Sequence, residues 1–347
     1  MFPSVMAAET PAVSIIIPLY NAERWILETL ASVRGQTFTG WEIVVVDDGS
    51  SDNGPAMVAA EGARDPRIHL YKQANAGPAV ARDLGMRQAK GDWILFLDSD
   101  DLLPVGRLSR DLAVARDNPH CKAVAGATEW FSEDGKIDHR ALLAHDKHLN
   151  LWRHQFHAVF NFAAILVRRD IYHTSGGFSA DRSVHYAEDY DYTLRLLEQC
   201  EMAQIEDIGV RVRKHGSNRS TLAERTVIDH TLEVIRRTWR RYGVELSVAE
   251  ADRLLRFWRQ EPAVLTLADC KDVIRLQGLL AGAYLRKRPD ARSSVARIWE
   301  QTLALRLNEA RFTKAEESGL LRFEAEERGH LGASKIRLRL FKMRWRR

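Results

Sequence analysis

Four short runs of β-branched and aromatic residues constrain the fold of the first half of the chain most. Each run is continuously apolar, a pattern typical of strands buried on both faces of a sheet. The runs are Val13–Ile17, Ile43–Val46, Ile68–Tyr71 and Trp93–Leu97. Stretches long enough for crossover helices follow them, at residues 22–33, 56–63, 78–89 and 107–116. This alternation predicts an α/β fold with a mostly parallel sheet and helices on both faces.

The second part of the chain has a different hydrophobic pattern. From about residue 226, apolar residues recur at spacings of three and four, as in Thr231–Trp239 and Ala251–Trp258, which is the periodicity of amphipathic helices. The formal net charge of +4 divides unevenly, because residues 225–347 carry 27 basic and 16 acidic groups and the rest carries 24 and 31. We therefore predict a first domain at residues 1–224 and a smaller helical domain at 225–333 with a different role.

Cysteine usage and hydropathy predict the compartment. Cys121, Cys200 and Cys270 form no C-x-x-C pair, so neither a disulfide framework nor a thiolate zinc site is indicated. No signal-peptide pattern and no run of about 18 uncharged apolar residues occurs. These features predict a cytoplasmic chain that does not span a membrane.

The last residues form a basic segment, predicted as a separate tail at 334–347. Lys335–Arg347 contains seven basic and no acidic side chains, interleaved with apolar and aromatic ones. This composition favours an anionic membrane surface, which would place the chain peripherally on the inner face of the plasma membrane. A solvated tail is an alternative. Nucleic acid is a third and is the least favoured, because no recognition module accompanies the tail.

Polar segments follow each predicted strand of the first domain. They are Pro18–Asn21, Asp47–Asp52, Asn75–Gly77 and Asp98–Asp101. Each could be an ordinary turn or helix cap, since Asp, Asn, Ser and Gly are common there. In open α/β sheets, however, ligands bind beyond the carboxyl ends of the strands. Together these segments predict one ligand site along that edge.

The acidic turn Asp98–Asp101 concentrates carboxylates at this edge. Hard divalent cations such as Mg²⁺ or Mn²⁺ take oxygen ligands and often bridge one or two carboxylates to substrate phosphates. The turn is therefore a candidate metal bridge to a diphosphate. A solvated acidic turn is the alternative.

The order of these motifs resembles the inverting nucleotide-sugar transferases of glycosyltransferase family 2, which have the Rossmann-like GT-A fold. The resemblance covers about residues 12–220. Its motifs are Ile17–Asn21, Ser32–Thr37, Val46–Asp52, Asn75–Gly85, Leu97–Asp101, Gly176–Phe178 and Glu188–Asp191.

For the donor, the resemblance implies a nucleoside-diphosphate sugar. Pro18 and Tyr20 would frame the base and ribose. Asp48 would accept a hydrogen bond from a base ring nitrogen, often of uracil, which favours a UDP-sugar. Asn75 and Arg82 would lie near the phosphates or the donor sugar.

For the chemistry, the resemblance implies that Asp98 touches the ribose or donor sugar and that Asp100 is the main ligand of Mn²⁺ or Mg²⁺. His215, in a basic-x-His segment, is a further candidate ligand. Inverting transfer requires a carboxylate that takes the acceptor proton and a cation that neutralises the diphosphate. Asp189 would be the general base, with Glu188 beside it orienting a loop or the sugar.

Three further observations concern the expected roles of individual acidic residues and histidines. Asp191 is a rival base, but its position in a helix predicted at 190–198 favours a first-turn cap. Asp83 stands where the family often has Asn, which would add a negative charge near the phosphates. Four histidines are predicted as surface or acceptor-loop residues, because they lack zinc spacing. They are His145, His148, His154 and His157.

The resemblance also indicates which type of sugar transfer to expect. The Gln-x-x-Arg-Trp motif and transmembrane helices of processive synthases are missing, which predicts transfer of a single sugar to a glycan or lipid-linked acceptor in bacterial-type surface polysaccharide assembly. A non-catalytic nucleotide-binding scaffold is the alternative. A dehydrogenase is disfavoured, because Pro18–Asn21 replaces the Gly-x-Gly-x-x-Gly turn after the first strand.

Overall fold

The computed structural model describes residues 10–218, 223–259 and 266–299, and Leu320. The predicted basic tail at 334–347 and most of residues 300–333 lie outside the described residues. The described chain separates into two compact units. The first comprises residues up to His145 together with Phe160–Val227, and the second comprises Asp146–Val159 together with the residues from Ile228 onward.

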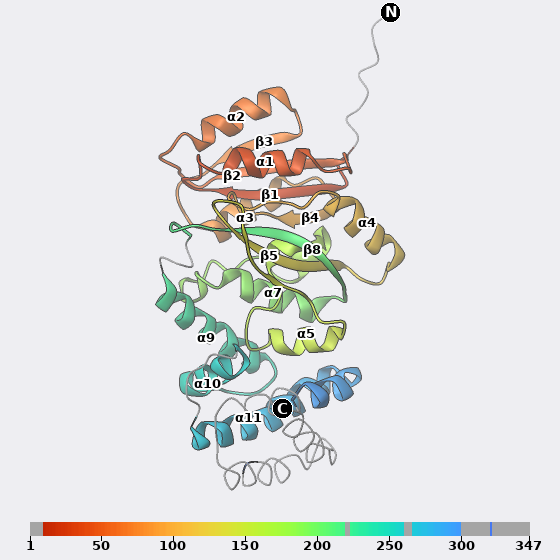
Figure 1. The fold of residues 1–347 in the computed structure, drawn as a ribbon, viewed down its shortest axis with the longest axis vertical. Helices are drawn as coiled ribbons and strands as arrows, with labels where there is room; N and C mark the ends of the chain where they lie inside the picture. Colours follow the sequence, from red (N-terminus) through yellow and green to blue (C-terminus); the bar gives the residue numbers. More distant parts are fainter. Residues whose placement is uncertain (1–9, 219–222, 260–265, 300–319, 321–347) are drawn as a thin grey trace, which may run out of the picture. The chain divides into compact units, whose positions relative to one another are not determined.

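The first unit contains the predicted parallel strands (Figure 1). They are β1 (Val13–Leu19), β2 (Trp41–Asp47), β3 (Ile68–Lys72) and β4 (Trp93–Phe96). Their order in the sheet is β3-β2-β1-β4, and every neighbouring pair is parallel. All seven residues of β2 are buried, which explains the unbroken apolar run at its centre.

The four predicted crossover helices are also present. They are α1 (Ile26–Arg34), α2 (Gly54–Arg64), α3 (Pro78–Gln88) and α4 (Arg107–Asp117). Helix α3 packs against β1 and β2, and α2 packs against β3. The prediction of an α/β sheet with helices on both faces is confirmed (Figure 1).

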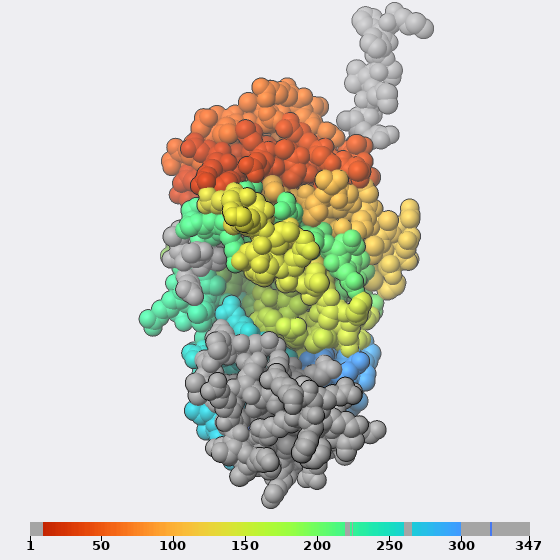
Figure 2. Space-filling view, in the orientation of Figure 1, coloured from red at the N-terminus to blue at the C-terminus, as the bar shows by residue number. Residues whose placement is uncertain are grey.

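Beyond β4 the sheet becomes mixed. The added strands are β5 (Ala123–Ser132), β6 (Ile137–Ala141), β7 (Ile165–Arg168) and β8 (Met202–Lys214). Strand β7 is antiparallel to both β4 and β5, β6 is antiparallel to β5, and β8 is parallel to β5. Strand β6 is exposed along most of its length, and the yellow residues around β5 and β6 lie at the surface of this unit in the space-filling view (Figure 2).

Short helices connect these strands. They are η1 (Phe162–Ala164), α6 (Arg169–Thr174), η2 (Arg182–Val184) and α7 (Glu188–Gln199). A fully buried arginine links α4 to η1 and to β8. Arg107 pairs with Asp111 through its Nε at 2.5 Å and donates from Nη1 to the carbonyl oxygens of Ala163, at 3.2 Å, and Gly209. Because Gly209 lies in β8, this buried pair ties α4 to the strand that leads to His215.

The second unit is helical, and it includes residues 146–159, which the predicted boundary after residue 224 places in the first domain. Its elements are α5 (Lys147–His154), α9 (Glu224–Arg241), α10 (Val248–Arg259), α11 (Leu267–Lys287) and η3 (Pro289–Ala291). Aromatic rings form its core: Phe156 stacks on Trp258 with centroids 5.1 Å apart, and Trp152 meets Tyr284 edge-on at 5.0 Å. None of the helices in the described part of the chain is long and apolar enough to cross a membrane.

Candidate active site

The loops after β1 and β2 are joined by hydrogen bonds. Asn21 Oδ1 accepts from the backbone N–H of Ser51 at 2.8 Å, and the Glu23 N–H donates to Asp52 at 2.7 Å. Pro18, in β1, pairs in register with Val46. Tyr20 follows it with 54% of its surface exposed, so its ring is available to a ligand at this edge.

Asp48 is buried and organises the loop that carries Asn75. Its carboxylate accepts from Gln73 Nε2 at 2.8 Å and from the backbone N–H groups of Ala76, at 2.8 Å, and Gly77, at 2.9 Å. Asn75 itself is exposed. A carboxylate offers about four acceptor sites, so Asp48 retains capacity for one further donor. Its contact with a nucleotide base stays a prediction.

Arg82 is the buried centre of the site. From α3 its Nη2 contacts Asp98 Oδ1 at 2.9 Å and its Nη1 contacts Glu188 Oε1 at 3.2 Å. Its guanidinium lies over the rings of Phe162, at 4.4 Å, and Phe178, at 5.0 Å. Arg82, Asp98 and Glu188 belong to three separate sequence motifs, and the structure brings them together as one charge cluster.

Burial and the charges of this cluster together shift the pKa values of Arg82 and Asp98. Burial opposes the charge on Arg82, but the carboxylates of Asp98 and Glu188 outweigh it and raise the pKa of the guanidinium. Burial also raises the pKa of Asp98, against the attraction of Arg82. Buried charges of this kind are stable only when they are paired and hydrogen-bonded.

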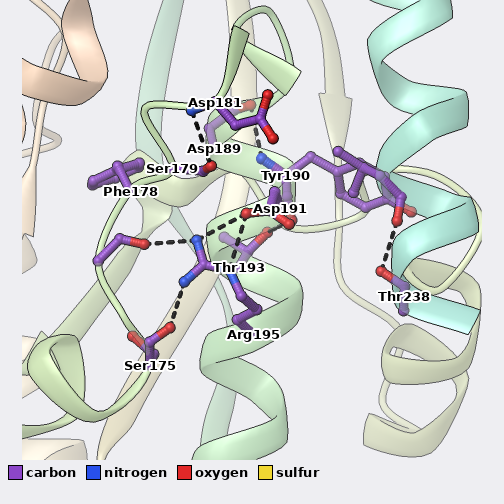
Figure 3. A network of polar contacts seen from close by, with 12 residues as sticks. Ser175, Phe178, Ser179, Asp181, Asp189, Tyr190, Asp191, Thr193, Arg195 and Thr238 are labelled. Carbon is purple, nitrogen blue, oxygen red and sulfur yellow. Dashed lines mark hydrogen bonds and ion pairs between the residues drawn. The ribbon is translucent and has the colours of Figure 1, made fainter. Parts of the chain in front are cut away.

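Asp189 lies beside this cluster in the first turn of α7. Burial, reinforced by the negative charge of Glu188, raises the pKa of Asp189 to about 6, while Arg82 acts in the opposite direction. Its Oδ1 accepts from the backbone N–H of Tyr190 at 2.8 Å (Figure 3). A carboxylate whose pKa lies near neutrality suits a general base.

Asp100 and His215 meet at the end of the acidic turn. His215 Nε2 lies 2.9 Å from Asp100 Oδ2, and the imidazole stacks on Trp25 with centroids 5.4 Å apart. Two ligands in adjacent positions of an octahedral Mg²⁺ site, each about 2.1 Å from the ion, are separated by about 3.0 Å. The donor types and their separation therefore fit a divalent cation, and Mn²⁺ accepts imidazole more readily than Mg²⁺ does.

Arg213, at the end of β8, holds the acidic turn and was not identified as a site residue from sequence. Its backbone N–H donates to Asp101 Oδ1 at 3.0 Å, and its Nε donates to the Asp100 carbonyl at 3.0 Å. Its guanidinium lies 4.4 Å from the ring centroid of Trp25. Burial, with the charges of Asp100 and Asp98, raises the pKa of Asp101 well above its ordinary value. The basic residue two positions before His215 was the available signal.

A second group of potential ligands lies elsewhere in the first unit. Within the described residues, His120, Cys121 and Glu201 form the one group of three whose ligand atoms lie within 4.8 Å of one another. These residues precede β5 and β8, whereas His215 follows the opposite end of β8. Asp100 and His215 would supply two ligands at most, and phosphate and water oxygens would fill the other positions of a Mg²⁺ site. Their role as metal ligands stays a prediction.

The prediction of surface or acceptor-loop positions does not fit His157, which is half-buried and whose pKa burial lowers to about 3, and it is wrong for His154. His154 lies on α5 with no exposed surface, and burial lowers its pKa to about 3. Its Nδ1 accepts from the backbone N–H of Val159 at 3.0 Å. The neighbouring Trp152 and Phe156 were the sequence signal, because both pack into the aromatic core of the second unit.

Comparisons with known proteins point to one family and one fold. The family model described as glycosyl transferase family 2 matches residues 14–176. A Haemophilus influenzae protein described as an uncharacterized glycosyltransferase is 38% identical over 143 residues, covering 38% of this chain and 57% of the relative. EpsJ of Bacillus subtilis, also described as an uncharacterized glycosyltransferase, is 27% identical over 218 residues, covering 61% and 63%. Bacillus subtilis TuaG, named for teichuronic acid biosynthesis, is 40% identical over 103 residues, covering 29% and 41%.

Among solved structures, Staphylococcus aureus TarS 1–349 superposes with a TM-score of 0.53 at 20% identity, covering 91% of this chain and 90% of that one. The mannosyltransferase PcManGT of Pyrobaculum calidifontis gives 0.51 at 19% identity, covering 92% and 87%. These similarities establish the GT-A-like fold. The chain spans less than two thirds of the length of the three curated relatives. The family match identifies residues 14–176 as a glycosyltransferase family 2 domain.

Proposed function

We propose that this chain transfers a single sugar, with inversion, from a nucleoside-diphosphate sugar to a hydroxyl of a glycan or lipid-linked acceptor. The observation that carries the proposal is the Arg82 cluster, which connects Asp98 of the acidic turn to Glu188, next to the candidate base Asp189. A donor-binding turn and a base are thereby held in one rigid arrangement. The biosynthetic name of TuaG supports a role in surface polysaccharide assembly.

A UDP-sugar is the favoured donor. TarS has been solved in complex with UDP-GlcNAc and with UDP, which supports uridine as the base. PcManGT has been solved with GDP-Man and Mn²⁺, which supports a divalent cation. In this chain Pro18, Tyr20 and Asp48 would contact the nucleoside, and Asn75 and Arg82 would lie toward the phosphates or donor sugar.

The reaction assigns a role to each carboxylate. The acceptor oxygen forms a bond to the anomeric carbon while the bond from that carbon to the diphosphate oxygen breaks, and the acceptor proton passes to Asp189. Glu188 keeps Arg82 in place, and Arg82 in turn orients Asp98 toward the donor. Asp100 and His215 would hold Mn²⁺ or Mg²⁺, whose charge neutralises the diphosphate.

A donor screen tests the function without knowledge of the acceptor. We expect slow release of nucleoside diphosphate from at least one UDP-sugar in the presence of Mn²⁺ or Mg²⁺, measured by chromatography, because water replaces the acceptor hydroxyl. The Asp100→Ala chain serves as the matched blank. Tight binding of nucleotide sugars by calorimetry with no release from any of them would support the non-catalytic scaffold instead.

The pH dependence of transfer follows from the pKa of Asp189. The base acts only when it is deprotonated, and its pKa is raised to about 6. We therefore expect log kcat/KM to rise with a slope of about one below pH 6 and to level off above it. The measurement uses saturating Mn²⁺ at every pH. A profile that stays flat between about pH 5 and 7 contradicts the assignment of Asp189 as base.

A further inference from the structure

The loop that follows α6 is clamped from one side by α7 (Figure 3). Arg195 donates from Nη2 to the Gly177 carbonyl at 2.6 Å and from Nη1 to the Ser175 carbonyl. Asp191 holds the same guanidinium, with Oδ2 at 2.9 Å from Nε and 2.8 Å from Nη2. Asp191 is thus engaged with Arg195, four residues along the helix, and its side chain is only 6% exposed.

The other side of the loop is held by Tyr172 and Asp83. The Tyr172 hydroxyl donates to Asp83 Oδ1 and accepts from the Phe178 N–H at 3.3 Å. Gly177 has φ +62°, and a Cβ there would lie 2.9 Å from the Tyr172 hydroxyl. Asp83 therefore faces Tyr172, and its carboxylate holds the Tyr172 hydroxyl against the loop.

The clamped loop presents Phe178 to the centre of the site. Phe178 is buried, and its ring packs against Tyr192 at 4.5 Å and edge-on against Phe96 at 4.9 Å. Its ring also lies 5.0 Å from the guanidinium carbon of Arg82. A continuous set of contacts thus runs from Arg195 through the loop and Phe178 to Arg82.

We propose that Arg195, held by Asp191, is a positioning residue that fixes Arg82 between Asp98 and Glu188 by clamping the 175–178 loop beneath it. This inference rests on the proposed function, in which Asp189 is the base. Arg195 acts only through Phe178 and Arg82. A guanidinium suits this task because its planar fork donates to two carbonyls and a carboxylate at once, which a lysine does not match.

The charges around Asp189 show how its pKa should respond to loss of the clamp. The groups that act on it are Glu188 in its own helix, Arg82 from α3 and Asp98 from the turn after β4. Of these three, Arg82 alone is positive, and it lowers the pKa of Asp189. If the clamp is lost and Arg82 moves away, the pKa of Asp189 should rise.

The test compares full-length Arg195→Met and Arg195→Lys with wild type. Arg256→Met is the matched control, because Arg256 forms a similar pair with Asp252, four residues before it, in the second unit. In Arg195→Met we expect the acid limb of the pH profile of kcat/KM to move to higher pH by about half a unit or more. We expect kcat near pH 6 to fall about tenfold, and the KM for the donor to stay within about threefold of the wild-type value. We expect a smaller shift in Arg195→Lys and none in Arg256→Met.

A second readout needs no turnover. The melting temperature of each protein is compared with that of its Asp189→Asn counterpart as pH varies. Because the pKa of Asp189 is higher in the folded than in the unfolded chain, its contribution to stability declines as pH rises from about 4 and levels off near the folded pKa. The levelling point should lie higher in Arg195→Met.

The outcomes separate the two proposals. A folded Arg195→Met protein with an unchanged levelling point and acid limb overturns the positioning role, even if its overall rate has fallen. A shifted levelling point in a chain that releases no nucleotide supports the positioning role and refutes the proposed transfer reaction. If Arg195→Met does not fold, Tyr172→Phe, which weakens the opposite side of the clamp, should produce the same upward shift, and its failure to do so also overturns the proposal.

Discussion

Replacing Asp189 by asparagine is expected to lower kcat by about 10²- to 10⁴-fold, the usual contribution of a general base. Donor affinity, measured by calorimetry with a UDP-sugar, should change by no more than about threefold, because a base assists the attack of the acceptor rather than ground-state binding. Asparagine retains an Oδ1 that accepts from the Tyr190 N–H, so the local backbone of α7 should be preserved.

Folding of this variant is not expected to limit the experiment. Burial disfavours the charged form of Asp189, so a neutral side chain removes an unfavourable charge at pH 8. Asp170→Asn is the matched control, because Asp170 lies in the first turn of α6 and accepts from the following N–H at 3.0 Å in the same way. Wild-type turnover in Asp189→Asn would assign the base elsewhere.

Sequence alone predicted those features that depend on neighbours along the chain. The apolar runs at Val13–Ile17 and Ile43–Val46 identified β1 and β2, because strands buried on both faces must be apolar at successive positions. The amphipathic spacing at Thr231–Trp239 identified α9 for a similar reason. The antiparallel placement of β7 beside β4 was not predicted, because register and direction depend on the path of the whole chain.

The same distinction holds within the site. The acidic turn and the Glu188–Asp189 pair were identifiable as motifs. The contact of Arg82 with Glu188 joins residues 106 positions apart, and that of Arg213 with Asp101 joins residues 112 positions apart. Such contacts are created by tertiary packing, so a single sequence contains no local pattern for them. His154 is a different case, because Trp152 and Phe156 beside it in the sequence were a local signal of its burial.

The position of Arg82 has a consequence for how the site can vary. Its guanidinium is almost fully buried and serves Asp98 and Glu188 at once. Removal of one partner from such a cluster leaves an uncompensated buried charge. The donor side and the base side are therefore coupled through one residue, and substitutions on either side are expected to be non-additive with those on the other.

Replacing Asp100 by alanine, or adding excess EDTA to the wild type, is expected to lower transfer by about 10³-fold or more, since neutralisation of a leaving diphosphate by a cation is worth several kcal/mol. Mn²⁺ or Mg²⁺ should restore the chelated wild type but not Asp100→Ala. His215→Ala should keep measurable activity and require a higher Mn²⁺ concentration, because it retains the carboxylate but loses the imidazole that lies 2.9 Å from it.

Asp117→Ala, at an exposed position at the end of α4, is the matched control. Full transfer in excess EDTA would exclude a cation requirement, and the contact between Asp100 and His215 would then be a structural ion pair that holds the segment after β8 against the acidic turn.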